Sequence, residues 1–272
     1  MTVVAITGAG RGIGRATARR LAADGYLVAI GDLDADAARE VAGQIPGAIG
    51  LPLDVSDPTQ IAAFLDRVEV DLGPVDVLIN NAGIMPVAPF LEHDDALARR
   101  IVDINLHGPL AGMREVLPRM LARGGGHIIN VASIAGRQGV PGGVVYSAAK
   151  HGVVGMSESI RREYGARGIA VTTVFPAFTN TELIAGTHNL RGSTPVEPED
   201  VAEAIAKVLV SRKPELYVPK RFGLLMRLLL VLPPAVADRL AQLSGANNSF
   251  RDVDTRRRAE YDRRISPPTP NG

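Results

Sequence analysis

The sequence predicts a single-domain α/β protein in which a doubly wound parallel sheet of about seven strands carries helices on both faces. Two observations support this prediction. Short apolar runs alternate with helical segments from Val3 to Ser211 without a linker, an internal repeat or a low-complexity block. In addition, the first apolar run passes into a glycine-rich turn that precedes a helical segment. The apolar runs predict strands near Val3, Leu27, Ile49, Val75, His127, Ala170 and Leu216.

The glycine-rich turn spans residues 7–14, after the apolar run 3–6 and before a helix expected over residues 15–23. A strand, a glycine turn and a helix N-terminus together present backbone N–H groups to a pyrophosphate. Glycine permits both the turn and the close approach. The spacing G-x-x-x-G-x-G differs from the commoner G-x-G-x-x-G, so the turn alone is a weak signal. The candidate residues are Gly8, Arg11, Gly12, Ile13 and Gly14.

A second apolar run, residues 27–31, ends at Asp32, which follows Gly14 by 18 residues (32 − 14 = 18). An acidic side chain at this place would accept hydrogen bonds from an adenosine ribose, next to Leu33. The alternative is that Asp32 caps a helix or forms a turn.

Tyr146 and Lys150 have the four-residue spacing that stacks two side chains on one face of a helix. For tyrosine to act as a base near neutral pH, its pKa must fall by roughly 3 units, or about 4 kcal/mol. A lysine charge about 4 Å away supplies roughly that much. Ser133, thirteen positions before Tyr146 (146 − 133 = 13), follows the apolar run 128–131 at a sheet edge. Taken alone, the pair would be ordinary residues of an amphipathic helix and Ser133 a turn serine.

Two more motifs follow in order: Asn80-Asn81-Ala82-Gly83 after a strand, and Asn105 in a helical segment. The ordered set resembles the short-chain dehydrogenase/reductase family, in its compact single-domain branch, over roughly residues 2–218. The resemblance implies a Rossmann-type fold. It also implies hydride transfer between a nicotinamide cofactor and a carbinol or carbonyl carbon.

The resemblance gives each catalytic residue a role. Tyr146 would be the general acid or base, which contributes about 10² to 10⁴-fold. Ser133 would hold the substrate oxygen, Lys150 would bind the nicotinamide ribose, and the Asn105 carbonyl would support a water leading from the lysine to solvent. The implied cofactor contacts are Gly8, Arg11, Gly12, Ile13, Gly14, Asp32, Leu33, Asp54, Val55, Asn81, Ala82, Gly83, Tyr146, Lys150, Pro176, Thr179 and Thr181.

The cofactor is expected to be NAD, with NADP less favoured. Asp32 would repel a 2′-phosphate, whereas Arg11 stands where relatives can carry a basic residue that contacts it. A carboxylate pointing at the 2′ position should dominate over one flexible arginine. The chain departs from the family at Ala177, where a glycine usually follows Pro176. Because alanine resists positive φ, we expect a shifted loop and an active enzyme.

The substrate is expected to be a hydrophobic secondary alcohol or its ketone. Residues from Thr179 to about 195 should form a mobile flap beside the site. The pocket walls are expected to be mostly apolar, with one polar anchor in Gln138; the candidates are Ile134, Gln138, Val140, Val144, Phe178 and Leu183. The histidines His93, His127 and His188 lack triad spacing and are expected to be surface or loop residues.

The expected organisation is a catalytic and dinucleotide-binding domain at 1–220, a helical extension at 221–265 packed on that domain or on a subunit, and a disordered tail at 266–272. The apolar stretch 222–232 is too short to span a bilayer, which takes about 20 residues. It could cover the substrate pocket, contact a subunit or, least favoured, anchor the protein at a membrane surface. Residues 251–264 mix arginines with acids, so a solvated helix is expected.

Composition narrows the function further. A formal charge of +1 with intermixed signs gives no reason to expect a nucleic-acid partner. With 0 cysteines, disulfides and thiolate metal sites are excluded, and no metal is expected. The first strand begins almost at once, so a cytoplasmic location without a signal peptide is expected. The preference for arginine over lysine hints at a GC-rich bacterial gene. Relatives in the resembled family commonly form dimers or tetramers.

The main alternative is a dinucleotide-binding regulatory protein without turnover. Such a protein has no need of Ser133, Tyr146, Lys150 and Asn105 together. The sugar-nucleotide epimerase branch would require another glycine spacing and a larger C-terminal substrate domain.

Overall fold

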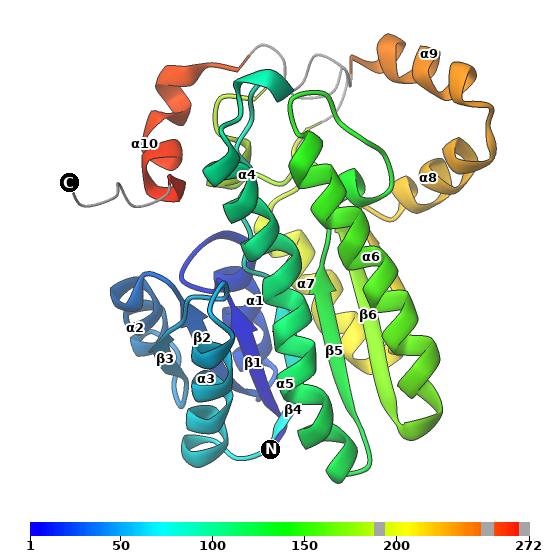
Figure 1. Ribbon diagram of the computed structural model, residues 1–272. Coiled ribbons are helices and arrows are strands. Elements are labelled where there is room, and N and C mark those ends of the chain that lie inside the picture. Colours follow the sequence, from blue (N-terminus) through cyan, green and yellow to red (C-terminus); the bar gives the residue numbers. More distant parts are fainter. Residues whose placement is uncertain (188–193, 246–252, 267–272) are drawn as a thin grey trace.

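The computed structural model describes residues 1–187, 194–245 and 253–266 (Figure 1). Its centre is one seven-stranded sheet in which every pairing is parallel. The predicted fold class is confirmed, and a strand forms at each of the seven expected places. The strands are β1 (Val3–Thr7), β2 (Leu27–Asp32), β3 (Ile49–Pro52), β4 (Val75–Asn80), β5 (Gly126–Val131), β6 (Ile169–Pro176) and β7 (Glu215–Val218).

Helices cover both faces of the sheet. One face carries α3 (Pro58–Asp71), α5 (Gly108–Ala122) and α6 (Val144–Tyr164), and the other carries α1 (Gly12–Ala23), α2 (Ala35–Gly43) and α7 (Pro198–Ser211). Side chains of β1 alternate between two cores: Val3 and Ala5 belong to one, Val4 and Ile6 to the other. A strand buried on both faces has no polar side, which explains its continuous apolar sequence.

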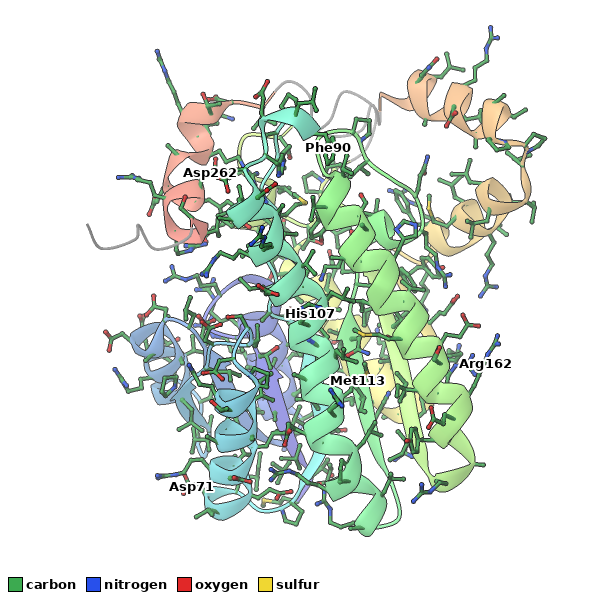
Figure 2. All side chains as sticks on the ribbon, in the orientation of Figure 1. Asp71, Phe90, His107, Met113, Arg162 and Asp262 are labelled. Carbon is green, nitrogen blue, oxygen red and sulfur yellow. The ribbon has the colours of Figure 1, made fainter. Side chains whose placement is uncertain are left out.

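Side chains on the covering helices follow the same division between core and solvent. Met113 of α5 is buried over the sheet, and its sulfur accepts a hydrogen bond from Asn130 Nδ2 at 3.4 Å. Arg162 of α6 and Asp71 of α3 extend away from the core (Figure 2). Both faces of the sheet are therefore covered by side chains, and only the ends of its strands remain accessible to a ligand.

The strand order is β3-β2-β1-β4-β5-β6-β7, so the chain reverses its direction of travel across the sheet between β1 and β4. The connections leaving β1 and β4 therefore diverge and open a crevice at their carboxyl ends. Open α/β sheets bind ligands at such a switch point. The glycine turn follows β1 and the Asn80 to Gly83 motif follows β4, so the order of strands brings both motifs to this crevice.

The helical segment expected around Asn105 is interrupted. It consists of α4 (Asp95–Val102), a π-helical turn over Asp103–His107, and α5. A π-turn widens the helix by one residue and is often found at functional sites. Asn105 lies in this turn.

The apolar stretch 222–232 forms most of α8 (Arg221–Val231), which is followed by α9 (Pro234–Ser244). The prediction that it covers the substrate pocket is wrong. The helix begins directly after the edge strand β7 and packs Met226 against Tyr217 and Phe175 there. Phe222 and Leu229 pack against the same cluster, but most of the other large apolar side chains of α8 and α9 are exposed, so a subunit contact or an interfacial anchor stays a prediction. Those exposed are Leu224, Leu225, Leu228, Leu230, Val231, Val236, Leu240 and Leu243.

None of the helices within the described ranges combines the length and apolar character needed to cross a bilayer. The last described helix is α10 (Thr255–Ile265), which lies across the carboxyl-end side of the sheet from α8 and α9 (Figure 1). The expectation of a solvated helix at 251–264 is wrong for one of its faces. Arg258, Tyr261 and Ile265 are buried on that face of α10. The polar groups of Arg258 and Tyr261 form hydrogen bonds with the backbone of Leu183 and Met85, so both side chains can be buried. The tail at 267–272 lies outside the described residues.

Candidate active site

The glycine turn has the backbone conformation that its sequence predicts. Gly8 and Gly12 have φ of +65° and +50°, a region that L side chains rarely adopt. A methyl group on Gly8 would lie 2.7 Å from the Ala82 Cα, and one on Gly14 would lie 2.4 Å from the Gly8 carbonyl oxygen. Glycine is therefore required here both for the turn itself and for the contact of α1 with it. The turn leaves the N-terminus of α1 facing the crevice.

Asp32 ends β2 beside the turn. Its Oδ2 accepts a hydrogen bond from Gly10 N at 2.8 Å, and its Oδ1 accepts one from Asp34 N at 3.0 Å. The carboxylate is thus held in a fixed orientation. Arg11 forms an ion pair with Asp34, and its Nη1 lies 3.9 Å from Glu182. The Arg11 guanidinium is therefore neutralised by carboxylates next to Asp32.

The motif after β4 connects that strand to the glycine turn. Asn81 Nδ2 donates hydrogen bonds to the carbonyl oxygens of Thr7 at 3.0 Å and Gly8 at 2.8 Å. A methyl group on Gly83 would lie 2.7 Å from Asn105 Oδ1 and 3.5 Å from Lys150 Nζ. Gly83 therefore keeps open a space onto which two polar side chains face.

Asn105 is fully buried in the π-turn. Its Nδ2 donates to the carbonyl oxygens of Ile84 at 2.8 Å and Ile101 at 2.9 Å, which fixes the loop after β4 to the helix. Its Oδ1 has no hydrogen-bond partner among the described residues. A buried acceptor without a partner is unfavourable, so this oxygen marks a place where a ligand or water belongs.

Ser133, Tyr146 and Lys150 come together at the carboxyl ends of β4 and β5. Tyr146 and Lys150 share the inner face of α6, with exposed fractions of 5% and 3%, and Lys150 Nζ lies 5.7 Å from the centre of the tyrosine ring. The ammonium donates a hydrogen bond to the Val131 carbonyl at 2.9 Å. The Ser133 hydroxyl accepts a hydrogen bond from Ala135 N at 3.1 Å, and it lies close enough to Tyr146 to lower the pKa of the phenol.

Burial controls the protonation of this group. It raises the pKa of Tyr146 to about 12, against the opposing effect of the Ser133 hydrogen bond. Burial also lowers the pKa of Lys150 to about 8. The net shift of the Tyr146 pKa is thus upward, because desolvation outweighs the stabilisation of the phenolate. A lowering contribution from Lys150 stays a prediction.

One cavity of about 880 Å³ joins these elements. Nearly all of the residues proposed from the sequence line it. Those from the catalytic and cofactor sets are Gly8, Arg11, Gly12, Ile13, Asp32, Leu33, Asp54, Val55, Asn81, Ala82, Gly83, Asn105, Ser133, Tyr146, Lys150, Pro176, Thr179 and Thr181, and those from the substrate set are Ile134, Val140, Phe178 and Leu183. Gly14 is buried behind the turn, where it permits helix packing.

Two proposed pocket residues, Val144 and Gln138, do not line the cavity. Val144 begins α6 two positions before Tyr146, so its side chain points to another side of the helix and is 47% exposed. Gln138 belongs to the turn before α6, and its N–H bonds to the Ile134 carbonyl at 3.2 Å. Gln138 therefore does not provide the polar anchor that was expected in the pocket wall.

The helix α10 contributes to the cavity, which was not predicted from the sequence. Tyr261, Arg264 and Ile265 line it, together with Arg100 of α4. Arg264 forms an ion pair with Glu182, which also lines the cavity. The spacing of Tyr261 and Ile265 by four residues was a usable signal, because it places two apolar side chains on one helix face.

Ala177 continues the extended path of β6 and donates its N–H to the Val218 carbonyl at 2.8 Å. Thr179 is buried and lines the cavity. None of the described non-glycine residues of this segment has a positive φ. The loop therefore reaches the cavity without the family's glycine.

The histidines do not contribute to the cavity as far as it is described. His127 was expected on the surface, which is wrong. It is buried in β5, its Nε2 lies 2.8 Å from Thr172 Oγ1, and desolvation lowers its pKa to about 4. His93 has ring nitrogens that are buried without a hydrogen-bond partner among the described residues. His188 lies outside the described residues.

The residues present fit a nicotinamide dinucleotide. Gly8 and Gly12 leave room for a close backbone approach at the N-terminus of α1, and Gly83 leaves room beside Lys150. The unpartnered Asn105 Oδ1 faces the same space. The Asp32 carboxylate lines the same cavity from the end of β2.

Comparison with known proteins agrees with this geometry. Residues 2–190 match the family model described as short chain dehydrogenase. A cis-4-hydroxycyclohexanecarboxylate dehydrogenase from Sinomonas cyclohexanicum is 41% identical over 218 residues, covering 75% of this chain and 87% of the relative. A cyclohexanol dehydrogenase from Acinetobacter sp. (strain SE19) is 34% identical over 218 residues, covering 76% of this chain and 87% of the relative.

Solved structures give a similar result. A short-chain dehydrogenase/reductase from Burkholderia phymatum, determined in complex with NAD, superposes with a TM-score of 0.77 at 26% sequence identity. The superposition covers 83% of this chain and 92% of the other.

Proposed function

The chain belongs to the short-chain dehydrogenase/reductase family, and from this premise we propose that it interconverts a hydrophobic secondary alcohol and its ketone, with Tyr146 as the general acid or base. At the coarser level it is an NAD(P)-dependent oxidoreductase acting on CH–OH groups. The observation that carries the proposal is that Tyr146 and Lys150 are buried side by side on α6 and line one cavity together with Ser133.

A bound nicotinamide dinucleotide would accept a hydride during alcohol oxidation and supply one during ketone reduction. The Ser133 hydroxyl would donate a hydrogen bond to the substrate oxygen and so orient it toward Tyr146. In oxidation the Tyr146 phenolate takes the proton of the alcohol, and in reduction the Tyr146 hydroxyl returns it. Positioned proton transfer of this kind contributes about 10² to 10⁴-fold to a rate.

Lys150 would favour the phenolate form of Tyr146. A unit charge about 6 Å away, at an effective dielectric near ~20, supplies roughly 3 kcal/mol. This stabilisation opposes the desolvation that raises the pKa of Tyr146. Gly83 gives the lysine access to the cofactor space, so the same ammonium would also hold the nicotinamide ribose.

NAD is the proposed cofactor, rather than NADP. The Asp32 carboxylate is fixed by two backbone N–H groups at the end of β2, where it would accept hydrogen bonds from ribose hydroxyls. A 2′-phosphate there would be repelled. Arg11, the basic residue that could compensate, is paired with Asp34 and lies near Glu182.

The substrate is proposed to be a compact, mostly apolar alcohol. The side chains of Ile134, Val140, Phe178 and Leu183 provide the apolar walls. The similarity to two dehydrogenases named for cyclohexane alcohols supports an alicyclic substrate. The proposed catalytic set speaks against a silent dinucleotide-binding protein.

The test is a panel of secondary alcohols assayed with NAD by the absorbance of the reduced nicotinamide. Tyr146→Phe should retain NAD binding and lose turnover by about 10² to 10⁴-fold. Tyr164→Phe, at the far end of the same helix, is the matched control and should behave like the wild type. Wild-type turnover in the Tyr146 variant would eliminate the proposed role, and absence of turnover with every alcohol would eliminate the proposed substrate class.

A further inference from the structure

The helix α10 forms part of the wall of the active-site cavity. Tyr261, Arg264 and Ile265 line the cavity from this helix, which follows the last strand by 36 residues in the chain (255 − 219 = 36, counting residues 219–254). The loops that border the cavity below α10 are the one after β4, which contains Met85, and the flap around the 3₁₀ turn Glu182–Ile184.

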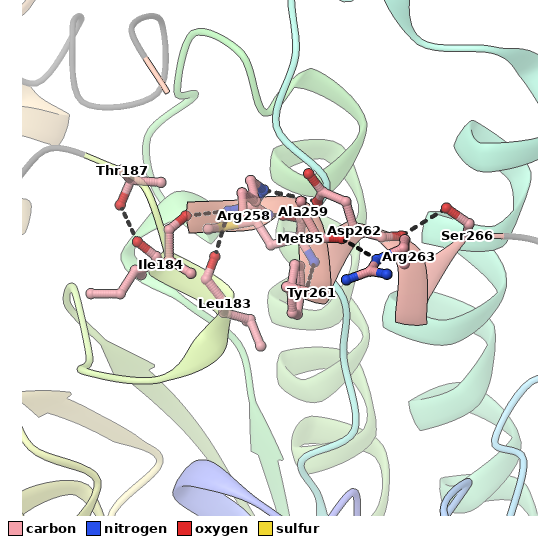
Figure 3. A network of polar contacts seen from close by, with 11 residues as sticks. Met85, Leu183, Ile184, Thr187, Arg258, Ala259, Tyr261, Asp262, Arg263 and Ser266 are labelled. Atoms are coloured by element: carbon pink, nitrogen blue, oxygen red, sulfur yellow. Dashed lines mark hydrogen bonds and ion pairs between the residues drawn. The ribbon is translucent and has the colours of Figure 1, made fainter. Parts of the chain in front are cut away.

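Arg258 fixes α10 to both loops. Its side chain is 1% exposed. Nη1 donates to the carbonyl oxygens of Leu183 at 3.0 Å and Ala185 at 3.1 Å, and Nη2 donates to the Met85 carbonyl. The nearby Asp262 carboxylate accepts from Nε at 3.0 Å and balances the buried charge (Figure 3). Three chain segments are thereby held in one arrangement.

Tyr261 lies three residues after Arg258 and points toward the same loops (Figure 3). Its ring is 4% exposed, and its hydroxyl oxygen accepts a hydrogen bond from Met85 N at 2.8 Å. The proton of this hydroxyl has no acceptor within residues 1–187, 194–245 and 253–266. Burial and the neighbouring Tyr146 raise the pKa of Tyr261, so the hydroxyl stays protonated and remains a donor at neutral pH.

The Tyr261 hydroxyl oxygen is engaged as an acceptor by Met85 N, and Tyr261 is a lining residue of the cavity. Two nearby arginines that could donate to a ligand already have partners. Arg264 forms an ion pair with Glu182, and Arg258 donates hydrogen bonds to the loop carbonyls. Beside Tyr261 the cavity is lined by the apolar side chains of Ile84, Leu183 and Ile265, and by the charged side chains of Arg100 and Arg264. A donor at a fixed place among apolar walls gives a substrate a fixed orientation.

We propose that the Tyr261 hydroxyl donates a hydrogen bond to a second oxygen of the substrate, remote from the reacting carbinol. This inference rests on the proposed function, because Ser133 and Tyr146 already engage the reacting oxygen. The substrate class is thereby narrowed to compact apolar alcohols or ketones that carry a distal oxygen acceptor, such as a carboxylate, an ester or an ether.

The test compares matched alcohols with and without the distal oxygen, for example cis-4-hydroxycyclohexanecarboxylate and cyclohexanol. Tyr261→Phe keeps the ring and removes the donor. We expect kcat/KM for the carboxylated alcohol to fall about 10- to 100-fold, the usual effect of one hydrogen bond to a charged acceptor, and kcat/KM for cyclohexanol to stay within about twofold. The Kd for NAD and the melting temperature report whether the variant is folded and binds cofactor.

Distinct outcomes separate this inference from the proposed function. An equal fall for both alcohols, or no change for either, would overturn the role of Tyr261 while leaving the alcohol dehydrogenase intact. Failure of the wild-type protein to oxidise any alcohol of the panel would overturn both. If Tyr261→Phe is unstable, direct binding of the two alcohols to the wild type in the presence of NADH provides the comparison. Binding of cyclohexanol as tight as that of its carboxylated counterpart would contradict the inference.

Discussion

Lys150 Nζ lies 5.7 Å from the centre of the Tyr146 ring, with both side chains buried on one face of α6. Two groups that are proposed to exchange protons with substrate and solvent are thus buried. The charged forms of both are disfavoured by that burial. At neutral pH only Lys150 carries its charge, so burial of the lysine is expected to destabilise the fold.

Lys150→Met should stabilise the protein and inactivate it. Burial lowers the pKa of Lys150 from 10.5 to about 8, so the unfolded chain binds a proton more readily between these values. Stability therefore falls as the pH drops from 10.5 to 8, and a penalty of about 3 kcal/mol persists at neutral pH. The lost hydrogen bond to Val131 offsets about 1 kcal/mol. We expect the free energy of unfolding to rise by about 1 to 3 kcal/mol in urea titrations at pH 7.

The control for this experiment is Lys207→Met. Lys207 is 69% exposed on α7, where its ion pair with Glu203 is surrounded by solvent. The free energy of unfolding should change by less than about 1 kcal/mol. A Lys150→Met variant that unfolds more easily than the wild type at pH 7 would show that its hydrogen bond outweighs its desolvation.

Asp32→Ala should reduce the preference for NAD over NADP. The variant removes the negative charge that would repel a 2′-phosphate, while Arg11 remains nearby. We expect the ratio of kcat/KM for NAD to that for NADP to fall at least about tenfold, equivalent to 1.4 kcal/mol. Asp36→Ala, exposed on α2, is the charge-matched control. An unchanged ratio in the Asp32 variant would assign the discrimination to another group.

Gly14→Ala and Gly155→Ala form a matched pair of helical glycine substitutions. A methyl group at Gly14 would meet the Gly8 carbonyl oxygen at 2.4 Å, whereas one at Gly155 would have no atom within 4 Å. Gly14→Ala should displace the turn, lower the melting temperature and raise the Kd for NAD at least about tenfold. Gly155→Ala should keep NAD affinity and gain about 0.5 to 1 kcal/mol of stability from the helix propensity of alanine. Equal NAD affinities in the two variants would contradict the tight contact at the turn.

His127→Gln should make the protein less sensitive to acid. Desolvation, with a smaller effect of the Arg212 charge, lowers the pKa of His127 from 6.5 to about 4. Between these pH values His127 is protonated in the unfolded chain but not in the folded protein. The free energy of unfolding therefore decreases as the pH falls from 6.5 to 4, by roughly 3 kcal/mol in all. Urea unfolding at pH 7 and pH 4.5 should show a smaller loss for the variant. His151→Gln, which changes an exposed histidine, should lose stability as the wild type does.

The sequence was sufficient to predict the sheet and most of the cavity, because their signals are local. The glycine turn requires glycine at positions with positive φ, and Tyr146 and Lys150 share a helix face at a spacing of four. Each motif also follows a strand, and parallel strands bring their carboxyl ends to one edge. Local chemistry and topology together were therefore enough to locate these residues.

The contribution of α10 could not be predicted in the same way. Arg258 binds the carbonyl oxygens of Met85, Leu183 and Ala185, and the chain separations from Arg258 are 173, 75 and 73 residues. Every residue carries such a carbonyl, so these acceptors leave no trace in the sequence. An arginine-rich segment consequently resembled a solvated helix. Val144 was wrongly placed in the pocket for a simpler reason. It lies two residues before Tyr146 on α6, so its side chain points to another side of that helix.

Because α10 follows all seven strands in the chain, the ribosome produces it after every strand has been translated. The part of the cavity wall that bears Arg258 and Tyr261 is thus the last to be made during biosynthesis. A message truncated before codon 255 would yield a chain with every strand present and one side of its binding chamber missing.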